Sequence, residues 1–283
     1  MASYSKSYQG RNLRFLLALA CLAAIVPSQL IAQVKGPWSH ELTPAPDKPF
    51  PDIRSFKATF RFGWSDIFDS ARASAEFTKS ADGKYSIHAS GQTIGLVRHL
   101  WKMNATHDAV GMLLQSIPLS MHQMETYAKK TIETKAYFQP DFSWSLRDAA
   151  PSTDPHKWRK IKVTNLRDLT SAMLFVRSQP LNVGDEIVFT AFPGDSAYLA
   201  RVHVASRETF LLNGESRKAL RLTLDIKKIN LQGPSKGELL PHSKFHSGTI
   251  WISDDADRMP IRAEVDIFVG YIHGQLESIH YGH

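Results

Sequence analysis

Residues 56–64 read FKATFRFGW, and in this stretch apolar side chains alternate with polar or small ones. An alternation with a period of two predicts a β-strand that buries one face. The same pattern continues through residues 71–78 and resumes at residues 85–89, after the pair Asp82-Gly83. An Asp-Gly pair between two alternating runs is a signal for a β-hairpin. This part of the chain therefore predicts an antiparallel sheet.

Similar patterns occupy most of the remaining chain, so that about a dozen strands are predicted in all. The pair Asn213-Gly214 predicts a two-residue hairpin turn in which both residues have positive φ angles. One or two turns of helix are expected at residues 94–101, where Ile94, Val97 and Trp101 share a face. Further strands are expected at residues 103–107, 129–138, 142–146, 187–191, 198–205, 210–212, 220–226, 250–253, 261–269 and 276–281.

Residues 165–178 differ from their surroundings because their apolar side chains recur at helical spacing. Asn165 or Asp168 can cap the start of this helix, and Pro180 ends it. A single amphipathic helix among strands must bury its apolar stripe, so we expect it on the concave face of the sheet. The predicted fold is mainly β: a curved antiparallel sheet, open and barrel-like, wrapped over one central helix. The stripe consists of Leu169, Ala172, Met173 and Val176.

The first 32 residues have the order of segments that is typical of a secretory signal peptide. A basic leader, residues 6–14, precedes the apolar run of residues 15–26, and Ala32 offers a small residue for cleavage. This run is too short for a membrane-spanning helix, which needs about 20 apolar residues. Cys21 fits a lipidation site only loosely because the apolar run continues past it, so lipid anchoring there is not expected. We predict an exported, periplasmic protein.

Five prolines follow the predicted cleavage site within residues 33–52. Proline fixes its own φ angle and has no backbone N–H, so we expect an extended arm that could act as a tether. The predicted organisation is a signal peptide over residues 1–32, a proline-rich arm over residues 33–54 and one mainly-β domain over residues 55–283. No transmembrane segment is predicted after the signal peptide, so the mature protein is expected to be soluble or peripheral.

The composition narrows the classes of function. The chain has 283 residues, of which 43% are apolar, and this is enough for a folded core. Cleavage after Ala32 would leave 31 of the 34 basic residues against 27 acidic ones, a net charge of +4. A charge this small and scattered argues against nucleic acid as a partner, which requires a basic stripe. The only cysteine, Cys21, would be lost, so the mature chain would have no disulfide and no thiolate.

A series of short motifs in the second half of the chain resembles a known family. The order of these motifs is similar to that of the bacterial envelope family named domain of unknown function 3108 (DUF3108), over residues 55–281. The resemblance implies an exported, β-rich protein that is built like the periplasmic lipoprotein carriers, in which a curved sheet wraps a helix. It implies no catalytic residue, because the family has no established activity. The motifs are Asp168–Ser171, Pro180–Asp185, Arg207-Glu208, Thr249–Asp255 and Arg258–Ile261.

Three short patterns could carry chemistry, but their surroundings favour loops. Gly233-Pro-Ser-Lys-Gly237 matches G-x-S-x-G, yet a nucleophile elbow needs a strand before the serine and a helix after it. His242 and His246 are four residues apart, but the prolines and glycines around them disfavour a metal-binding helix. The aspartates within residues 254–257 lack the spacing of a calcium-binding loop and are typical of a turn. We therefore predict no catalytic, metal or cofactor site.

The aromatic row of residues 56–64 is the strongest indication of a binding site. Its ordinary role would be to pack in the core under the helix. The alternative is an apolar cavity inside the curved sheet that accepts a lipid or another apolar ligand. The candidate lining residues are Phe60, Phe62, Trp64, Trp101 and Met173.

Three functions remain open on this basis. The leading hypothesis is a non-enzymatic binder or carrier of an apolar envelope component in the periplasm. The second is a structural or interaction protein that contacts other envelope proteins and whose apolar faces are only core. The third is a hydrolase that uses serine or histidine, which would require a histidine and a carboxylate to converge on an exposed serine. A cavity would favour the first hypothesis, and a filled interior would favour the second.

Overall fold

The computed structural model describes residues 33–47, 53–65, 67–152, 154–242, 247–266 and 270–282, and most of them lie in β-strands. The predicted signal peptide, with Cys21, lies outside these residues. The described helices are α2 (Gly95–Leu100), α3 (Leu169–Arg177) and the 3₁₀ turns η1 (Pro37–His40), η2 (Leu114–Ser116) and η3 (Pro155–Lys157), and none is long and apolar enough to cross a membrane. The strands are β1 (Phe56–Trp64), β2 (Phe68–Lys79), β3 (Lys84–Thr93), β4 (Met103–Met112), β5 (Ile117–Tyr127), β6 (Lys130–Phe138), β7 (Ser143–Ala149), β8 (Arg159–Ile161), β9 (Glu186–Ala191), β10 (Tyr198–Leu212), β11 (Glu215–Ile229), β12 (Leu239–Pro241), β13 (Gly248–Ser253), β14 (Pro260–Asp266) and β15 (Tyr271–Tyr281).

The fifteen described strands form one sheet with the order β8-β7-β6-β5-β4-β3-β2-β1-β15-β14-β13-β11-β10-β9, and β12 pairs with β11. The sheet thus consists of two meanders, β1 to β8 and β15 back to β9, which meet at its middle. At this junction Phe56 of β1 pairs with Tyr281 of β15, and Trp64 pairs with Ile272. The strand pairs are antiparallel, which confirms the prediction from the alternating runs.

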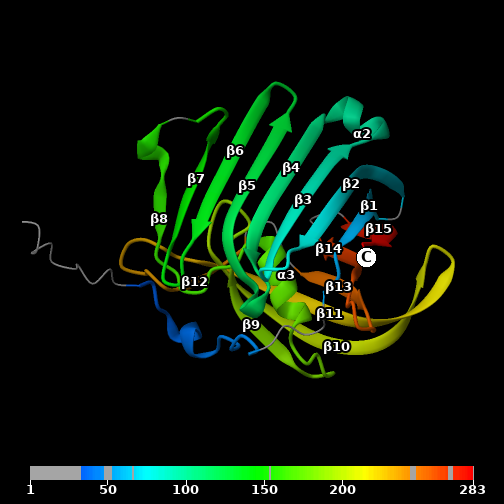
Figure 1. The fold of residues 1–283 in the computed structure, drawn as a ribbon. Coiled ribbons are helices and arrows are strands. Elements are labelled where there is room, and N and C mark those ends of the chain that lie inside the picture. Colours follow the sequence, from blue (N-terminus) through cyan, green and yellow to red (C-terminus); the bar gives the residue numbers. More distant parts are fainter. Residues whose placement is uncertain are drawn as a thin grey trace, which may run out of the picture. The chain divides into compact units, whose positions relative to one another are not determined.

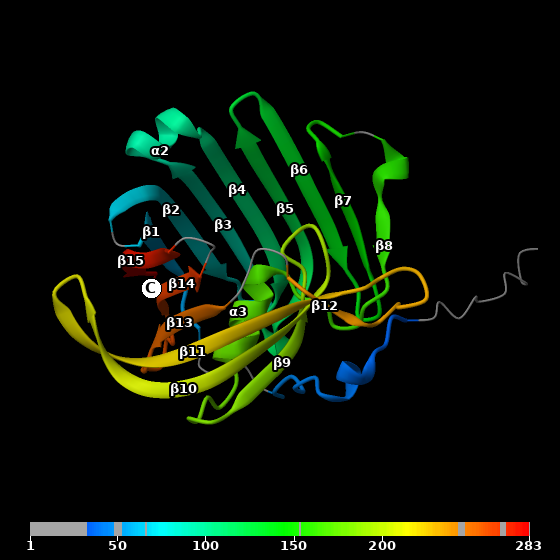
Figure 2. The ribbon, with the colours of Figure 1, turned by 180° about the vertical axis from the view of Figure 1, so that it is seen from behind.

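The sheet curves around α3 without closing into a barrel. Figures 1 and 2 show α3 between the upright strands β2–β8 and the long band of β10 and β11, which crosses on the other side of the helix. The end strands, β8 and β9, are the two edges of the described sheet and do not pair with each other. The predicted fold, an open and curved antiparallel sheet wrapped over one central helix, is therefore confirmed. The shorter helix α2 is the turn of helix expected near residues 94–101.

Side chains fix both ends of α3. At the start, Asp168 Oδ1 accepts a hydrogen bond from Ser171 N at 2.6 Å, so Asp168 is the N-cap. The helix starts later than the predicted residue 165 because Asn165 has a positive φ of 52° and Arg167 N donates to Thr190 O of β9. At the far end, Arg258 donates to the backbone oxygen of Arg177, which would otherwise be an unpaired carbonyl of the last turn.

The buried face of α3 is not the stripe that the periodicity predicts. Ala172 and Val176 are buried, but Leu169 is 55% exposed and Met173 is only half-buried, so this prediction is wrong for two of four residues. Leu174 and Phe175 are buried instead, because the sheet curves around the helix and contacts it on more than one side. Leu174 packs with the core around β1 and β2, and Phe175 packs with the core around β9 to β11.

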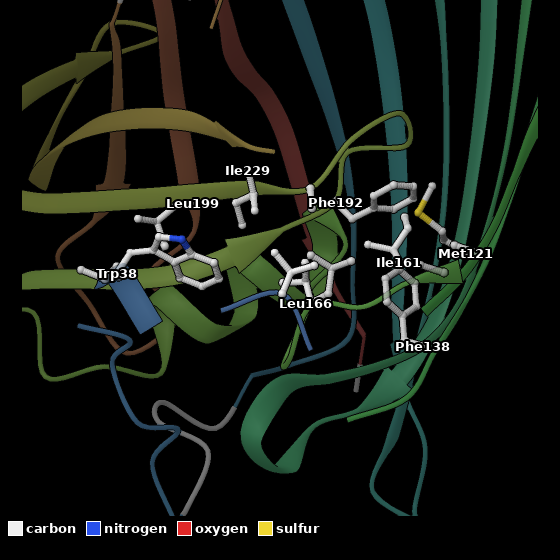
Figure 3. Packing of buried hydrophobic residues seen from close by; sticks show 14 residues of the cluster. Trp38, Met121, Phe138, Ile161, Leu166, Phe192, Leu199 and Ile229 are labelled. Atoms are coloured by element: carbon white, nitrogen blue, oxygen red, sulfur yellow. The ribbon is translucent and has the colours of Figure 1, made fainter. Parts of the chain in front are cut away.

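The proline-rich segment packs into the domain over residues 33–47 and is not a free tether there. Trp38, in η1, is buried in the same core cluster as Leu199 and Ile229 (Figure 3), and its Nε1 donates to Gly237 O at 2.8 Å. Thr43 N donates to Val188 O at 2.9 Å, so the segment also follows β9 at the edge of the sheet. The expectation of a tether is wrong for residues 33–47, because the core buries Trp38 and β9 binds the backbone of Thr43.

The turn between β10 and β11 agrees with the sequence. Leu212 pairs with Glu215, which leaves Asn213 and Gly214 as the two turn residues, with φ angles of 51° and 85°. Both angles are positive, as this type of hairpin requires. The predicted two-residue turn is therefore confirmed.

An apolar cleft beside α3

Two apolar cavities lie beside α3, and its partly exposed side chains Leu169 and Met173 border both. Cavity A lies between α3 and strands β1–β4 and has a volume of about 350 Å³. Cavity B lies between α3 and strands β9–β11 and has a volume of about 210 Å³. Leu169 and Met173 thus form a ridge within one cleft. Exposed apolar side chains on an otherwise buried helix are unusual enough to mark this cleft as the candidate site.

Small and large side chains together shape cavity A. Ala75 of β2 pairs with Ala89 of β3, and these short side chains leave space below the helix. Below them Phe77 stacks on Phe56 at 5.3 Å and on Tyr85 at 5.8 Å between ring centroids. These stacked rings give the cavity a floor that is already held in place by the core. Its other apolar lining residues are Phe60, Ile87, Leu174, Met259 and Pro260.

Cavity B has an aliphatic wall. The strands that form it point alternate side chains at α3, as shown by the pairing of Val202 in β10 with Leu224 in β11. Tyr198 is the one described lining residue with a side-chain hydroxyl, and that hydroxyl donates to Asp195 at 3.3 Å. The remaining lining residues are Ala172, Val176, Phe189, Ala191, Pro193, Ala200, Leu222, Ile226 and Ile250.

Two basic side chains, Arg177 and His107, border cavity A. Arg177 Nε donates to Asp257 O at 3.2 Å, and burial lowers the pKa of Arg177 to about 10. Arg177 therefore keeps its positive charge at neutral pH, although no ion pair with it is formed among the described residues. His107 Nε2 has no hydrogen-bond partner in the described part of the chain. The cavity is thus apolar with a cationic edge.

The helix start next to cavity A carries a buried carboxylate. Asp168 is fully buried, and its Oδ2 has no hydrogen-bond partner among the residues that the structure describes. Burial raises the pKa of this carboxyl group, while its hydrogen bonds with Ser171 act in the opposite direction. Burial also raises the pKa of Tyr85, which lies near Asp168. No contact among the described residues aligns these groups with an exposed nucleophile.

The structure brings two of the five predicted lining residues to the cleft. Phe60 and Met173 line cavity A. Phe62, Trp64 and Trp101 are not among the residues that line either cavity. Phe62 lies against Gly274 of β15, where a larger residue would clash with its ring.

Trp64 and Trp101 lie at the far end of the sheet. Trp64 contacts Phe68 edge-on, with ring centroids 5.8 Å apart, and Trp101 stacks on Tyr127 at 6.0 Å. Both tryptophans are exposed. The predicted aromatic row therefore divides along β1. Phe56 and Phe60 line the cleft, whereas Phe62 and Trp64 do not.

The lining residues on the other strands were not predicted from the sequence. A signal for them was present in the run Ala71, Ala73 and Ala75, because alternating alanines on the inner face leave space that larger residues would fill. Cavity B offered no such signal, because its residues read as ordinary buried strand positions. Only the curvature of the sheet opposite α3 leaves them partly uncovered.

Two of the three patterns that could have carried chemistry lie in turns, and the third is only partly described. Ser235 is in a turn between β11 and β12, so no helix follows it as a nucleophile elbow requires. His242 contacts the ring of Tyr198 at 5.5 Å, whereas His246 is outside the described residues. Asp255 Oδ1 accepts from Asp257 N at 3.0 Å, which is the role of an aspartate in a tight turn. Among the described residues no three His, Cys, Asp or Glu side chains are grouped to hold a metal ion.

Comparison with protein families shows to which family this chain belongs. The family model described as protein of unknown function (DUF3108) matches residues 55–277, which is most of the sheet and all of α3. The chain belongs to the DUF3108 family. This confirms the resemblance that the order of the motifs indicated. No curated protein matches the DUF3108 chain.

One solved structure supports the fold of this DUF3108 protein, and two others are similar at lower TM-scores. A β-barrel-like protein of the domain of unknown function DUF1849 from Brucella abortus is similar with a TM-score of 0.54 and 10% identity, over 81% of this chain and 98% of its own. A protein inferred to be exported, with a YmcC-like fold, from Bacteroides fragilis has a TM-score of 0.32 and 11% identity, over 82% and 98%. A protein inferred to be a lipoprotein from Parabacteroides distasonis has a TM-score of 0.33 and 8% identity, over 82% and 97%. At these identities the first likeness concerns the fold alone.

Proposed function

We propose that this DUF3108 protein is an exported, non-enzymatic binder that carries a lipid or another apolar component of the cell envelope in the cleft beside α3. The observation that supports this proposal best is the lining of cavity A and cavity B, which is almost entirely apolar and includes the exposed Leu169 and the half-buried Met173. Leaving such side chains in contact with water costs free energy, which an apolar ligand would recover.

The shape of the cleft suits a chain-like ligand. Cavity A, at about 350 Å³, is within the range of small-molecule sites, and cavity B continues past the same helical ridge. Arg177 at the edge of cavity A adds one positive charge, which would attract an acidic or carbonyl headgroup. An amphiphile with one long apolar chain therefore fits the chemistry of the cleft better than a flat aromatic molecule.

Binding is tested with a fluorescent long-chain fatty acid as the probe, together with mass spectrometry of lipids that copurify with the protein. Ala75→Trp places an indole inside cavity A, and we expect it to weaken probe binding at least about tenfold because it removes the apolar contact area of the ligand. Ser74→Trp is the matched control, since Ser74 is the neighbour of Ala75 on the opposite, exposed face of β2.

Equal binding by both variants and by the wild type would contradict the cleft as the site. No probe binding and no copurifying lipid would favour the second function, a structural or interaction protein of the envelope. Export itself is tested by cell fractionation and by sequencing the N-terminus of the mature protein. We expect a periplasmic form that begins near Gln33, without a lipid at Cys21, and an intact leader on a cytoplasmic protein would contradict export.

A further inference from the structure

Large apolar side chains are exposed together at one end of the sheet. Ile67 is 76% exposed, Leu96 is 71% exposed and Leu100 is 80% exposed, and Trp101 is 54% exposed. These side chains lie in the β1–β2 turn and in the connection between β3 and β4 that contains α2. Figure 1 shows α2 at the end of the upright strands that is remote from the band of β10 and β11. We call this end the α2 rim; its exposed apolar residues are Trp64, Ile67, Phe68, Leu96, Leu100, Trp101 and Ile272.

Contacts hold the parts of the α2 rim beside one another. Ile94 N donates to Ser70 O at 2.9 Å, which joins α2 to the start of β2. Ala128 N donates to Lys102 O at 2.9 Å, which joins the end of the α2 connection to the β5–β6 turn. Trp101 stacks on the ring of Tyr127 and is therefore presented in a fixed orientation. These contacts hold α2 and Trp101 against the neighbouring strands at this end of the sheet.

The charges that flank this surface are positive. Lys102, Lys129 and Lys130 are exposed, and none forms an ion pair with a carboxylate among the described residues. Two carboxylates on the adjoining strands β2 and β5 are already paired: Asp69 with Arg61 at 3.6 Å and Glu125 with Arg147 at 2.6 Å. Apolar and aromatic side chains flanked by unpaired lysines are the combination that binds the interface of an anionic bilayer.

We propose that the α2 rim docks on an anionic lipid surface, with Leu96, Leu100 and Trp101 inserted among the headgroups and acyl chains. The lysine charges decide between a membrane and a protein as the partner. A protein covering the apolar residues would remove lysine charges from water, at a cost that only placed carboxylates offset. Anionic headgroups meet Lys102, Lys129 and Lys130 while those charges stay hydrated.

A row of small residues connects the cleft with the α2 rim. Ala73 and Ala71 continue the inner face of β2 from Ala75 toward Phe68, over about 23 Å at 3.3 Å per residue. Gly91 pairs with Ala73 and is equally small. Docking at the α2 rim would therefore place the inner face that leads to cavity A next to the membrane. The docking surface itself does not depend on the proposed function, because no lining residue of either cavity belongs to the α2 rim.

The experiment is vesicle cosedimentation with residues 33–283, which form a compact unit that contains all three core clusters. The probes are phosphatidylcholine vesicles with and without roughly one-third phosphatidylglycerol. We expect binding to the anionic vesicles and weaker binding as salt screens the lysines. Leu96→Gln with Leu100→Gln should weaken binding at least about tenfold, because their apolar burial is lost. Replacing the three lysines by glutamine should weaken binding to anionic vesicles about fivefold per charge and leave neutral vesicles unaffected.

The matched control is Leu211→Gln, which removes a similarly exposed leucine near the end of β10, a strand that contributes no residue to the α2 rim, and should leave binding unchanged. Failure of the wild type to bind anionic vesicles, or an equal loss in Leu211→Gln, would overturn the proposal. Ala75→Trp separates the two proposals: it should lose the fatty-acid probe and keep the vesicles. A protein that binds vesicles but never the probe would refute the carrier and leave the docking surface standing.

Discussion

Replacing Asp168 tests how the central helix is held against the sheet. Its side chain is fully buried and Oδ1 accepts from Ser171 N at 2.6 Å, so Asp168→Ala should lose an N-cap worth about 1 kcal/mol of unfolding free energy. Asp168→Asn keeps an acceptor for Ser171 N and removes the buried charge. Arg167 compensates this charge only in part: its attraction lowers the pKa of Asp168 less than burial raises it, and its guanidinium donates to Gln115 O at 3.0 Å. We therefore expect the asparagine variant to be clearly more stable than the alanine variant.

The raised pKa of Asp168 determines whether the free energy of unfolding increases or decreases with pH. Burial raises the folded-state pKa of Asp168 above the ordinary 3.8, so the folded protein binds the proton more tightly than the unfolded chain does. The resulting stability is complete below the unfolded pKa and is lost as the pH rises through the folded pKa. Each unit of that shift corresponds to about 1.4 kcal/mol. Relative to Asp168→Asn, which has no such proton, the wild type should become less stable as the pH rises.

Urea denaturation of the wild type and both variants, followed by circular dichroism from about pH 4 to about pH 8, measures these differences. A wild type that gains stability over Asp168→Asn with rising pH would refute the reasoning, because it would mean that nearby cations outweigh burial. Equal losses in the asparagine and alanine variants would show that the charge, rather than the capping acceptor, matters.

Three further predictions concern the buried Trp38, the turn at Gly214 and the carboxyl group of Glu133. Trp38→Ala should lower the free energy of unfolding, measured by urea denaturation, by about 3–5 kcal/mol because it empties a buried site. The control His40→Ala changes an exposed residue nearby and should alter this free energy by no more than about 0.5 kcal/mol. Gly214→Ala should cost about 1 kcal/mol by the same assay through its positive φ alone, since no atom lies near the added methyl group; an unchanged midpoint would contradict the turn. The pKa of Glu133 is lowered chiefly by its hydrogen bond with Lys135, so its stabilisation is present above the unfolded value of 4.5 and lost as the pH falls through the folded pKa; Glu133→Gln should remove that loss in an acid titration.

Local patterns in the sequence were sufficient to predict the sheet and the existence of its helix. The alternation in residues 56–64 and the pair Asn213-Gly214 act through nearest neighbours, and the structure has β1 and a two-residue turn at these positions. The pair Asp168 and Ser171 likewise determines where α3 begins. Such features depend on a few adjacent residues and survive without knowledge of the tertiary fold.

The faces of α3 and the role of the first described residues could not be predicted in this way. Helical spacing places Leu169 and Met173 on one apolar stripe. Whether these side chains are buried depends on the path of strands that are distant in the sequence. The burial of Trp38 depends on Gly237, which is 199 residues away in the chain. The same holds for the candidate site. Phe60 could be predicted from the local alternation, whereas Val202 and Leu222 line a cavity only because the sheet curves.

The junction of β1 and β15 has a consequence for how the chain acquires its structure. In the described sheet the other strand pairs join elements that are close in sequence, so each meander can form through local hairpins. Pairing Phe56 with Tyr281 instead requires nearly the whole chain to be present. When the chain emerges with its N-terminus first, the edge of β1 that pairs with β15 stays unpaired until β15 has been made. Folding should therefore proceed through two separately formed halves with a slow, late docking step, and Ser278→Pro in β15 should arrest the protein between them.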